Sequence, residues 1–205
     1  MLITIEGIDG AGKSTLLASL KKELADCDPI FTREPGATWI GQVVRQAIAE
    51  EVDPVAEALL FVADHAMHCA AVIRPALDAG RLVISDRYTD SRFAYQQVTL
   101  RGHLQDPRRW LAALHEGWSI RPDLTFLLVL PVHRALERLD GENTREHFER
   151  EEVLTEVQAE YLARAGAEPS RFILVDAEEE RGVIASFVAE EIRRVCELRG
   201  RYPRS

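Results

Sequence analysis

The sequence has few of the residues that build disulfide frameworks, zinc sites and nucleic-acid-binding faces. Only three of its 205 residues are cysteines, and Cys27, Cys69 and Cys196 lie too far apart for a C-x-x-C site. Lysine and arginine number 25 against 34 acidic residues, a formal net charge of -9 at pH 7. A protein that grips the nucleic-acid backbone needs a basic face, so this charge balance disfavours nucleic acid as a partner.

Long hydrophobic runs are also lacking. By sequence, no stretch approaches the length of about 20 apolar residues that a transmembrane helix needs, and residues 1–5 are too short for a secretory signal. We therefore expect a cytoplasmic protein with reduced cysteines and no membrane contact. What the chain does have is a hydrophobic fraction of 46%, enough for the core of one compact domain spanning residues 1–205.

Short apolar runs alternate with segments of helical periodicity along the whole chain. Strands are expected at 2–6, 29–32, 82–85, 124–130 and 172–175. Helices are expected at 14–24, 40–51, 54–79, 91–100, 107–116, 131–139, 145–165 and 181–198, with a kink or break at Pro75. This alternation predicts an α/β fold of three layers, α/β/α, around a parallel sheet of roughly five strands.

The most specific motif is the glycine-rich segment at residues 7–14, which matches G-x-x-x-x-G-K-[S/T], the P-loop that binds phosphates. A chance match is the alternative, but this segment follows an expected strand and opens an expected helix, as a P-loop requires. Backbone N–H groups would cradle the phosphates, Lys13 would reach the β- and γ-phosphates, and the Ser14 hydroxyl would bind Mg²⁺. The predicted ATP-binding residues are Gly7, Asp9, Gly10, Ala11, Gly12, Lys13, Ser14 and Thr15.

Charged residues follow the other expected strands at the edge where the P-loop lies. Asp86 ends an apolar strand and would help to orient Mg²⁺, although a carboxylate there can also cap the next helix. Arg33 and Arg87 would grip a phosphate of the acceptor, unless each forms a surface ion pair instead. Asp9 would lie beside the bound triphosphate, an electrostatically costly place that suggests a role such as accepting a hydrogen bond from an acceptor hydroxyl.

Several motifs in consistent order resemble thymidylate kinases, the enzymes that phosphorylate dTMP to dTDP with ATP. They are GIDGAGKST at 7–15, TREPG at 32–36, LLFVAD at 59–64, DRY at 86–88 with Ser91, AYQ at 94–96 and PDLT at 122–125. The resemblance spans nearly the whole chain and implies a P-loop kinase fold with a small lid at about 138–150. It also implies a homodimer formed by packed helices.

The resemblance also implies roles for individual side chains. Phe61 would stack on the thymine ring, although an apolar residue in such a run more often belongs to the core. Arg33 and Arg87 would hold the dTMP phosphate, and Asp9 would meet the 3′-hydroxyl of the sugar. Tyr95 would pack near the sugar and help to exclude a 2′-hydroxyl.

Two regions depart from the family pattern. Where relatives carry an arginine that contacts thymine this chain has His65, a predicted substrate-binding residue whose neutral imidazole offers one donor at a shorter reach. Arg92, also a predicted substrate-binding residue, either replaces the missing cation from another direction or faces solvent. The lid lacks the usual Asp-Arg-Phe-Glu sequence, so Arg145 is the predicted catalytic cation of the lid, the alternative being a solvated helix face.

These patterns predict in-line transfer of the γ-phosphoryl group of ATP to a phosphate oxygen of dTMP. The predicted catalytic residues are Lys13, Asp9, Arg87 and Arg145, with Ser14 and Asp86 serving Mg²⁺. His65 leaves open a kinase for another nucleoside monophosphate such as dUMP. The altered lid leaves open a nucleotide sensor that has lost efficient catalysis.

Overall fold

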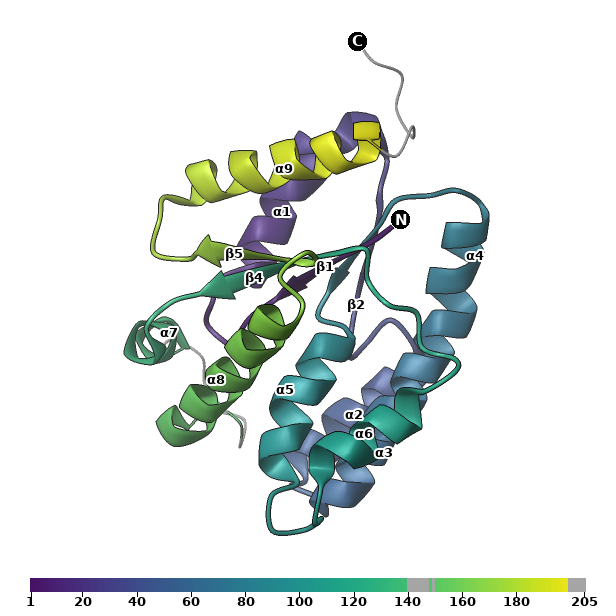
Figure 1. Cartoon of the computed structure of the whole chain (residues 1–205), viewed down its shortest axis with the longest axis vertical. Coiled ribbons are helices and arrows are strands. Elements are labelled where there is room, and N and C mark those ends of the chain that lie inside the picture. The colour runs from purple at the N-terminus through teal and green to yellow at the C-terminus, as the bar shows by residue number, and fades with distance from the viewer. Residues whose placement is uncertain (140–147, 149, 199–205) are drawn as a thin grey trace.

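The computed structural model describes residues 1–139, 148 and 150–198, and it contains a five-stranded parallel sheet (Figure 1). The strands are β1 (Leu2–Glu6), β2 (Ile30–Arg33), β3 (Val83–Asp86), β4 (Leu124–Val129) and β5 (Phe172–Asp176), in the order β2-β3-β1-β4-β5. The predicted fold class is therefore confirmed. Each predicted strand is present, with its ends shifted by one residue at most.

Helices cover both faces of the sheet. The α-helices are α1 (Lys13–Glu23), α2 (Trp39–Ala49), α3 (Pro54–His68), α4 (Arg74–Asp78), α5 (Thr89–Thr99), α6 (Pro107–His115), α7 (Val132–Leu139), α8 (Glu151–Ala167) and α9 (Arg181–Leu198). Figure 1 shows α1 and α9 together on one face, with α5 and α8 below the other. The three layers predicted from the alternating pattern follow from this arrangement.

The strands are apolar along their length because they are covered on both sides. All five residues of β1 are buried, and neighbouring residues on the strand contribute to different cores. Ile3 and Ile5 join the larger core with Phe126, whereas Leu2 packs with Tyr88 in the smaller one. A strand buried on both faces reads as a continuous hydrophobic run, which is the signal that revealed it in the sequence.

The long segment before β3 is interrupted, as the proline in it predicted. Helix α3 passes into a π-helical turn over Cys69–Ile73, and α4 then begins with Pro75 in its first turn. The helical stretch Pro54–Asp78 is long and apolar enough to cross a membrane by length and composition alone, so the expectation that none would be was wrong. Its most apolar window is 44% buried inside the molecule, and Phe61 and Ile73 belong to the cores.

Helix α8 begins later than predicted. The expected start, Arg145, lies outside the described residues, and Arg150 has an extended backbone with φ -96° and ψ 141°. The helix begins at Glu151, so the prediction that Arg150 is helical was wrong. The many acidic residues around 146–152 gave a helical pattern but no defined starting point.

The carboxyl ends of the parallel strands place the site. Ile5 of β1 pairs with Asp86 of β3, which in turn pairs with Arg33 of β2, so these three strands end side by side. The P-loop follows β1 directly, and in open parallel sheets ligands bind outside this edge.

Candidate active site

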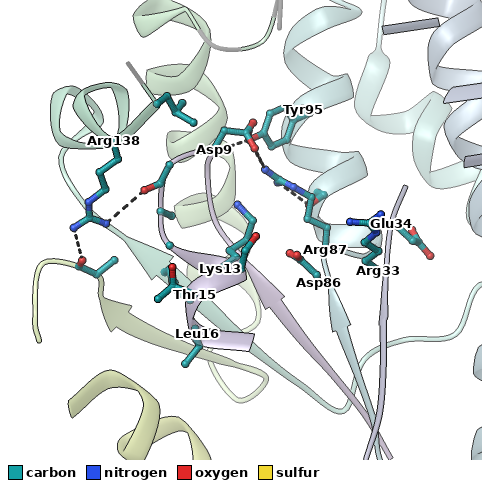
Figure 2. Close-up of a pocket in the computed structure, with 18 of the residues that line it drawn as sticks. Asp9, Lys13, Thr15, Leu16, Arg33, Glu34, Asp86, Arg87, Tyr95 and Arg138 are labelled. Carbon is teal, nitrogen blue, oxygen red and sulfur yellow. Dashed lines mark hydrogen bonds and ion pairs between the residues drawn. The ribbon is translucent and has the colours of Figure 1, made fainter. Parts of the chain in front are cut away.

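A cleft of about 1310 Å³ opens at the carboxyl edge of the sheet (Figure 2). It brings together the P-loop, the ends of β2 and β3, and the inner sides of α3, α5 and α7. Of the predicted site residues, it is lined by Asp9, Gly10, Ala11, Gly12, Lys13, Ser14, Thr15, Arg33, Phe61, Asp86, Arg87, Arg92 and Tyr95. Segments far apart in the sequence thus form one continuous site.

The P-loop has the backbone shape that its glycines predict. Gly10 has φ +78°, and a Cβ there would collide with the carbonyl oxygen of Ala135 in α7. Gly12 has φ +93° and is the N-cap of α1, so the helix begins at the next residue. The N–H groups of the first helical turn then lie at the cleft, where they favour an anion.

Lys13 is directed into the loop that it follows. Its buried Nζ donates hydrogen bonds to the carbonyl oxygens of Gly7, at 3.1 Å, and Ile8, at 2.8 Å. Burial, together with the positive charge of Arg87, lowers the pKa of Lys13 to about 8. A phosphate group bound in the loop would add negative charge beside this ammonium group and stabilise its charged form.

The residues predicted for Mg²⁺ fit such an ion. Oδ1 of Asp86 is buried and has no hydrogen-bond partner among the described residues, and Ser14 is exposed at the same cleft. The described residues contain no group of three or more His, Cys, Asp or Glu side chains that could hold a metal by itself. This donor set suits Mg²⁺, which usually binds one or two protein ligands, waters and substrate phosphates.

Asp9, Arg87 and Tyr95 form a polar cluster above the P-loop. Asp9 Oδ1 forms an ion pair with Arg87, and Tyr95 donates a hydrogen bond of 2.7 Å to Asp9 Oδ2. Burial acts to raise the pKa of Asp9, but the charges of Arg87 and Lys13 outweigh burial and hold this pKa below its usual value. Asp9 is therefore a carboxylate that neutralises nearby cations.

Arg87 has a strained backbone for a residue with a side chain, since its φ is +61°. The conformation is held on both sides, because Arg87 N donates to the Ile5 carbonyl and Ser85 Oγ donates to the Arg87 carbonyl at 2.7 Å. Such strained residues concentrate at functional sites. In this conformation Arg87, the residue after β3, points back over the P-loop, where its Nη1 donates to Gly7 O at 3.1 Å.

A buried glutamate that the sequence analysis missed supports this region from below. Glu6 accepts hydrogen bonds from the backbone N–H of Tyr88, at 2.8 Å, from Ser91, at 2.5 Å, and from Tyr161, at 2.9 Å. Burial and the nearby charge of Asp90 raise the pKa of Glu6 to about 7. Its position at the end of an apolar strand gave no signal, because its partners come from distant helices.

Two arginines lie at the far end of the cleft. Arg33 is the last residue of β2, whereas the sequence predicted it one position after the strand, and it lines the cleft. Arg45 of α2, which the sequence analysis missed, also lines the cleft. Arg45 Nη2 donates to the carbonyl oxygen of Pro35 at 3.2 Å, and a Cβ on Gly36 would meet both guanidinium groups. With Arg87 they form a basic region suited to a phosphate dianion.

The wall of the cleft beside this basic region combines an aromatic ring with polar side chains of α5. Phe61 of α3 is 4% exposed and lines the cleft, and the guanidinium carbon of Arg92 lies 4.2 Å from the centroid of its ring. Arg92 thus faces the cleft, not solvent. Gln96, one turn further along α5, also lines the cleft and was missed as a site residue.

The structure does not place His65 in the cleft. Its side chain is fully buried, with Nδ1 2.8 Å from Oε1 of Glu34 and Nε2 2.8 Å from Oγ of Ser119. Both ring nitrogens are therefore engaged within the protein. The expected direct contact between His65 and the substrate was therefore wrong, because His65 lies behind the wall of the cleft.

Arg138 of α7 lies at the opposite end of the cleft from Arg33, with Lys13 and Asp86 between them (Figure 2). Its guanidinium donates to the carbonyl oxygens of Ala177, at 3.0 Å, and Gly10, at 3.5 Å. It thereby joins the P-loop to the segment after β5. Arg145, the predicted cation of the lid, lies outside the described residues, as does most of the lid at 138–150.

A P-loop, an acidic strand end and a separate basic region in one cleft of a five-stranded parallel sheet define a P-loop phosphotransferase with room for a second ligand beside the phosphate donor. The family model described as thymidylate kinase matches residues 5–188. The chain belongs to the thymidylate kinase family.

Curated relatives agree over nearly the full length. The chain is 63% identical over 205 residues to a probable thymidylate kinase of Methanoculleus marisnigri, and the match covers 100% of each chain. It is 56% identical over 193 residues to a probable thymidylate kinase of Methanospirillum hungatei, covering 94% of each. A probable thymidylate kinase of Natronomonas pharaonis is 41% identical over 193 residues, covering 94% of this chain and 97% of the relative.

Proposed function

We propose that this protein transfers the γ-phosphoryl group of ATP to dTMP, giving ADP and dTDP in the synthesis of dTTP. The observation that carries the proposal is the shape of the cleft. A P-loop with Lys13 and Asp86 forms its middle, and Arg33, Arg45 and Arg87 surround a second anion position. Donor and acceptor phosphates can therefore meet within one site, as in-line transfer requires.

Catalysis rests on position and charge. An acceptor phosphate oxygen is ionised at neutral pH, so no strong general base is needed, and Arg33, Arg45 and Arg87 hold that phosphate. Lys13 neutralises the charge that develops on the transferred group, and Arg138 supports the P-loop near the donor. Asp9 keeps Arg87 in place and meets the sugar hydroxyl of the acceptor.

Ser14 and Asp86 would hold Mg²⁺, which supplies charge neutralisation at the donor phosphates when bound. Ser14 would offer its hydroxyl as a ligand. Asp86 would accept hydrogen bonds from waters through its buried, unpartnered Oδ1. The lid at 138–150, with Arg145, would close over the donor and exclude water.

A homodimer is part of the proposal, and an apolar face supports it. Trp39 and Val43 of α2 and Leu59 and Met67 of α3 are 66%, 37%, 46% and 37% exposed. Figure 1 shows these helices beside each other on the lower side of the molecule. A second copy of the chain covering this face would explain why α3 is apolar on both sides. The acidic charge and the three buried cysteines suit the proposed cytoplasmic location.

The test is a coupled assay of ADP release with ATP, Mg²⁺ and dTMP, beside dUMP, dCMP and no acceptor. Release with dTMP well above the no-acceptor rate is expected, and a Lys13→Met variant should reduce it by orders of magnitude. Preference for another nucleotide would change the assigned substrate but leave the proposed mechanism of phosphoryl transfer intact. Nucleotide binding without release for any acceptor would contradict the proposal and favour a sensor.

A further inference from the structure

Helix α5 presents two side chains to the acceptor end of the cleft, Arg92 and, one turn later, Gln96. They are 2% and 1% exposed, and both line the cleft. Nε of Arg92 and both amide atoms of Gln96 are buried and have no hydrogen-bond partner among the described residues. Buried polar groups are nearly always paired, so these three atoms indicate a ligand that completes them.

The unpaired atoms describe the chemistry of that ligand. Arg92 offers a donor, and Gln96 offers one donor and one acceptor within the same wall. The edge of a thymine or uracil ring carries a carbonyl oxygen at position 4 and an N–H at position 3, which match this set. Cytosine carries an amino group and a bare nitrogen at the same two positions.

The two residues differ in how strictly they can discriminate. A glutamine amide can turn over, so Gln96 can present either its oxygen or its nitrogen to a base. A guanidinium group has donors only and cannot lose a proton in a protein, so Arg92 has nothing to accept from an amino group. Discrimination against an amino group at position 4 therefore depends on Arg92.

We propose that Arg92 is the residue that selects a base with a carbonyl oxygen at position 4, and that Glu34, His65 and His68 hold Arg92 in the required place. This inference rests on the proposed function, because it concerns the acceptor site of that reaction. Arg92 is the specificity-determining residue, and the other three are positioning residues that act through it.

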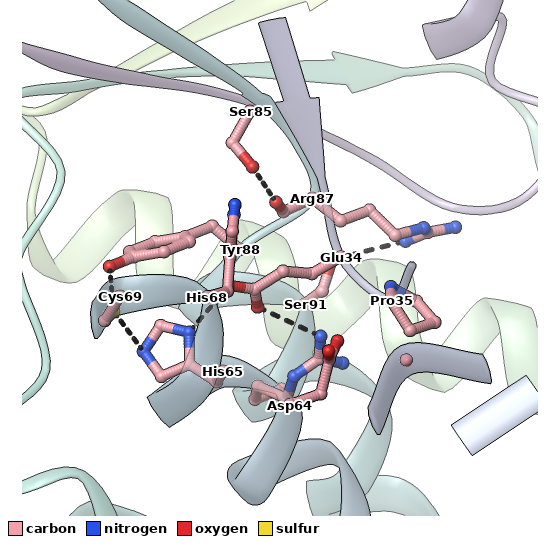
Figure 3. A network of polar contacts seen from close by, with 12 residues as sticks. Glu34, Pro35, Asp64, His65, His68, Cys69, Ser85, Arg87, Tyr88 and Ser91 are labelled. Atoms are coloured by element: carbon pink, nitrogen blue, oxygen red, sulfur yellow. Dashed lines mark hydrogen bonds and ion pairs between the residues drawn. The ribbon is translucent and has the colours of Figure 1, made fainter. Parts of the chain in front are cut away.

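The contacts around Glu34 show how the positioning works (Figure 3). Oε2 of Glu34 accepts a hydrogen bond of 3.1 Å from Nη2 of Arg92, while Oε1 lies 2.8 Å from Nδ1 of His65 and 2.6 Å from Nδ1 of His68. One carboxylate oxygen is thus fixed by two histidines and the other by Arg92. With this nitrogen engaged and the guanidinium on Phe61, Arg92 has little freedom to turn.

The far sides of both histidines are fixed as well. Nε2 of His65 lies 2.8 Å from Oγ of Ser119, and Nε2 of His68 lies 2.6 Å from Oγ1 of Thr32. Burial would raise the pKa of Glu34, but the charge and hydrogen bond of His65, the hydrogen bond of His68 and the charge of Arg92 hold this pKa well below its ordinary value. Glu34 is therefore a buried carboxylate that needs these partners and stabilises them in turn.

The first experiment separates the base edge from the rest of the nucleotide. It compares kcat/KM for dUMP and dCMP, which differ only at positions 3 and 4, in wild type and Arg92→Gln. Because a glutamine can turn to accept from an amino group, Arg92→Gln should lower the dUMP-to-dCMP ratio by about tenfold or more. The matched control, Arg108→Gln on the exposed side of α6, should leave the ratio unchanged.

The outcomes are distinct. An unchanged ratio in a folded Arg92→Gln variant would overturn the inference. If wild type phosphorylates no pyrimidine nucleotide, the proposed function fails, and equilibrium binding of dUMP and dCMP without ATP then tests Arg92 by itself. In that binding assay, equal loss of both nucleotides in Arg92→Gln would also count against selection at position 4.

The second experiment tests the positioning residues with His65→Leu and His65→Asn. Removing the Nδ1 donor should raise KM for dTMP about fivefold and lower the dUMP-to-dCMP ratio, with kcat changed much less. Asparagine restores a donor near Nδ1 and should recover most of the ratio. The milder Ser119→Ala tests the same point if His65→Leu does not fold. Lower stability with an unchanged ratio in all variants would show a merely structural role and overturn this part.

Discussion

The hydroxyl group of Tyr95 lies 2.7 Å from Oδ2 of Asp9, so a hydrogen bond joins helix α5 to the acidic residue of the P-loop. The same hydroxyl lies 3.1 Å from Nη2 of Arg87 and accepts from the backbone N–H of Asp9 at 3.1 Å. Donor and acceptor ends of the cleft therefore share a single polar cluster. A substitution in this cluster is therefore expected to alter ligand binding at both ends of the cleft.

Tyr95→Phe tests this cluster. Loss of the hydroxyl leaves Asp9 with its ion pair to Arg87 but frees space beside the sugar, so we expect about 1 kcal/mol lower stability and weaker rejection of a 2′-hydroxyl. The measurement is kcat/KM for dTMP against its ribonucleotide counterpart. An unchanged ratio would show that Tyr95 does not contact the sugar side.

ATP binding should depend on pH through Lys13. Its pKa in the free protein is about 8, and the negative phosphates of ATP will raise this pKa, so above pH 8 binding takes up a proton. Affinity should fall with rising pH in this range, by at most about tenfold per pH unit. Calorimetry at pH 8.5 in two buffers of different ionisation enthalpy measures the proton uptake. Lys13→Arg, which stays charged, should show none.

Stability should depend on pH through His65. Burial alone would lower the pKa of His65, but the charge of Glu34 raises it to about 9, above the value of about 6.5 expected in the unfolded chain. The stabilisation of the folded protein by the His65–Glu34 charge interaction is therefore complete below pH 6.5 and is lost as pH rises through 9. The free energy of unfolding in urea should differ most between wild type and His65→Asn at pH 6, and least at pH 9.5. A constant difference would contradict the assigned charge.

Asp86→Asn should change the Mg²⁺ requirement. The amide offers one neutral acceptor where the carboxylate offers charge, so we expect half-maximal activity to need about tenfold more Mg²⁺. Binding of ATP without Mg²⁺ should stay the same or tighten, because a negative charge near the phosphates is removed. Titration of activity with Mg²⁺ at saturating ATP and dTMP is the measurement. An unchanged midpoint would exclude Asp86 from the metal site.

The apolar face of α2 and α3 predicts the assembly state. A charge on this face, Met67→Glu, should turn the dimer into a monomer, because a stable interface of about 800 Å² per partner does not tolerate an unpaired buried carboxylate. Sedimentation velocity measures the change. Val183→Glu on α9, 56% exposed and on the opposite layer, is the matched control. A wild-type monomer would contradict the proposed homodimer.

The fold was predictable because its signals are local. Each strand is a short apolar run, the P-loop residues have a fixed spacing, and Pro75 predicted the break between α3 and α4. The start of α8 was less predictable, since a run of charged residues has helical periodicity without a capping residue. The P-loop side of the site was predicted in the same way, and the cleft contains every residue assigned to it except Gly7.

Residues close together along the chain were enough to predict the phosphate-binding loop, the parallel sheet and the family, because each of these depends on local patterns. Which side chains share the cleft depends instead on how the helices pack in three dimensions. Arg45 and Gln96 reach it from helix faces that look ordinary in the sequence, and His65, the residue directly after the LLFVAD motif of α3, turns away to Glu34. Direction, burial and the choice of partner depend on how helices from distant segments pack, and no spacing along the chain encodes them.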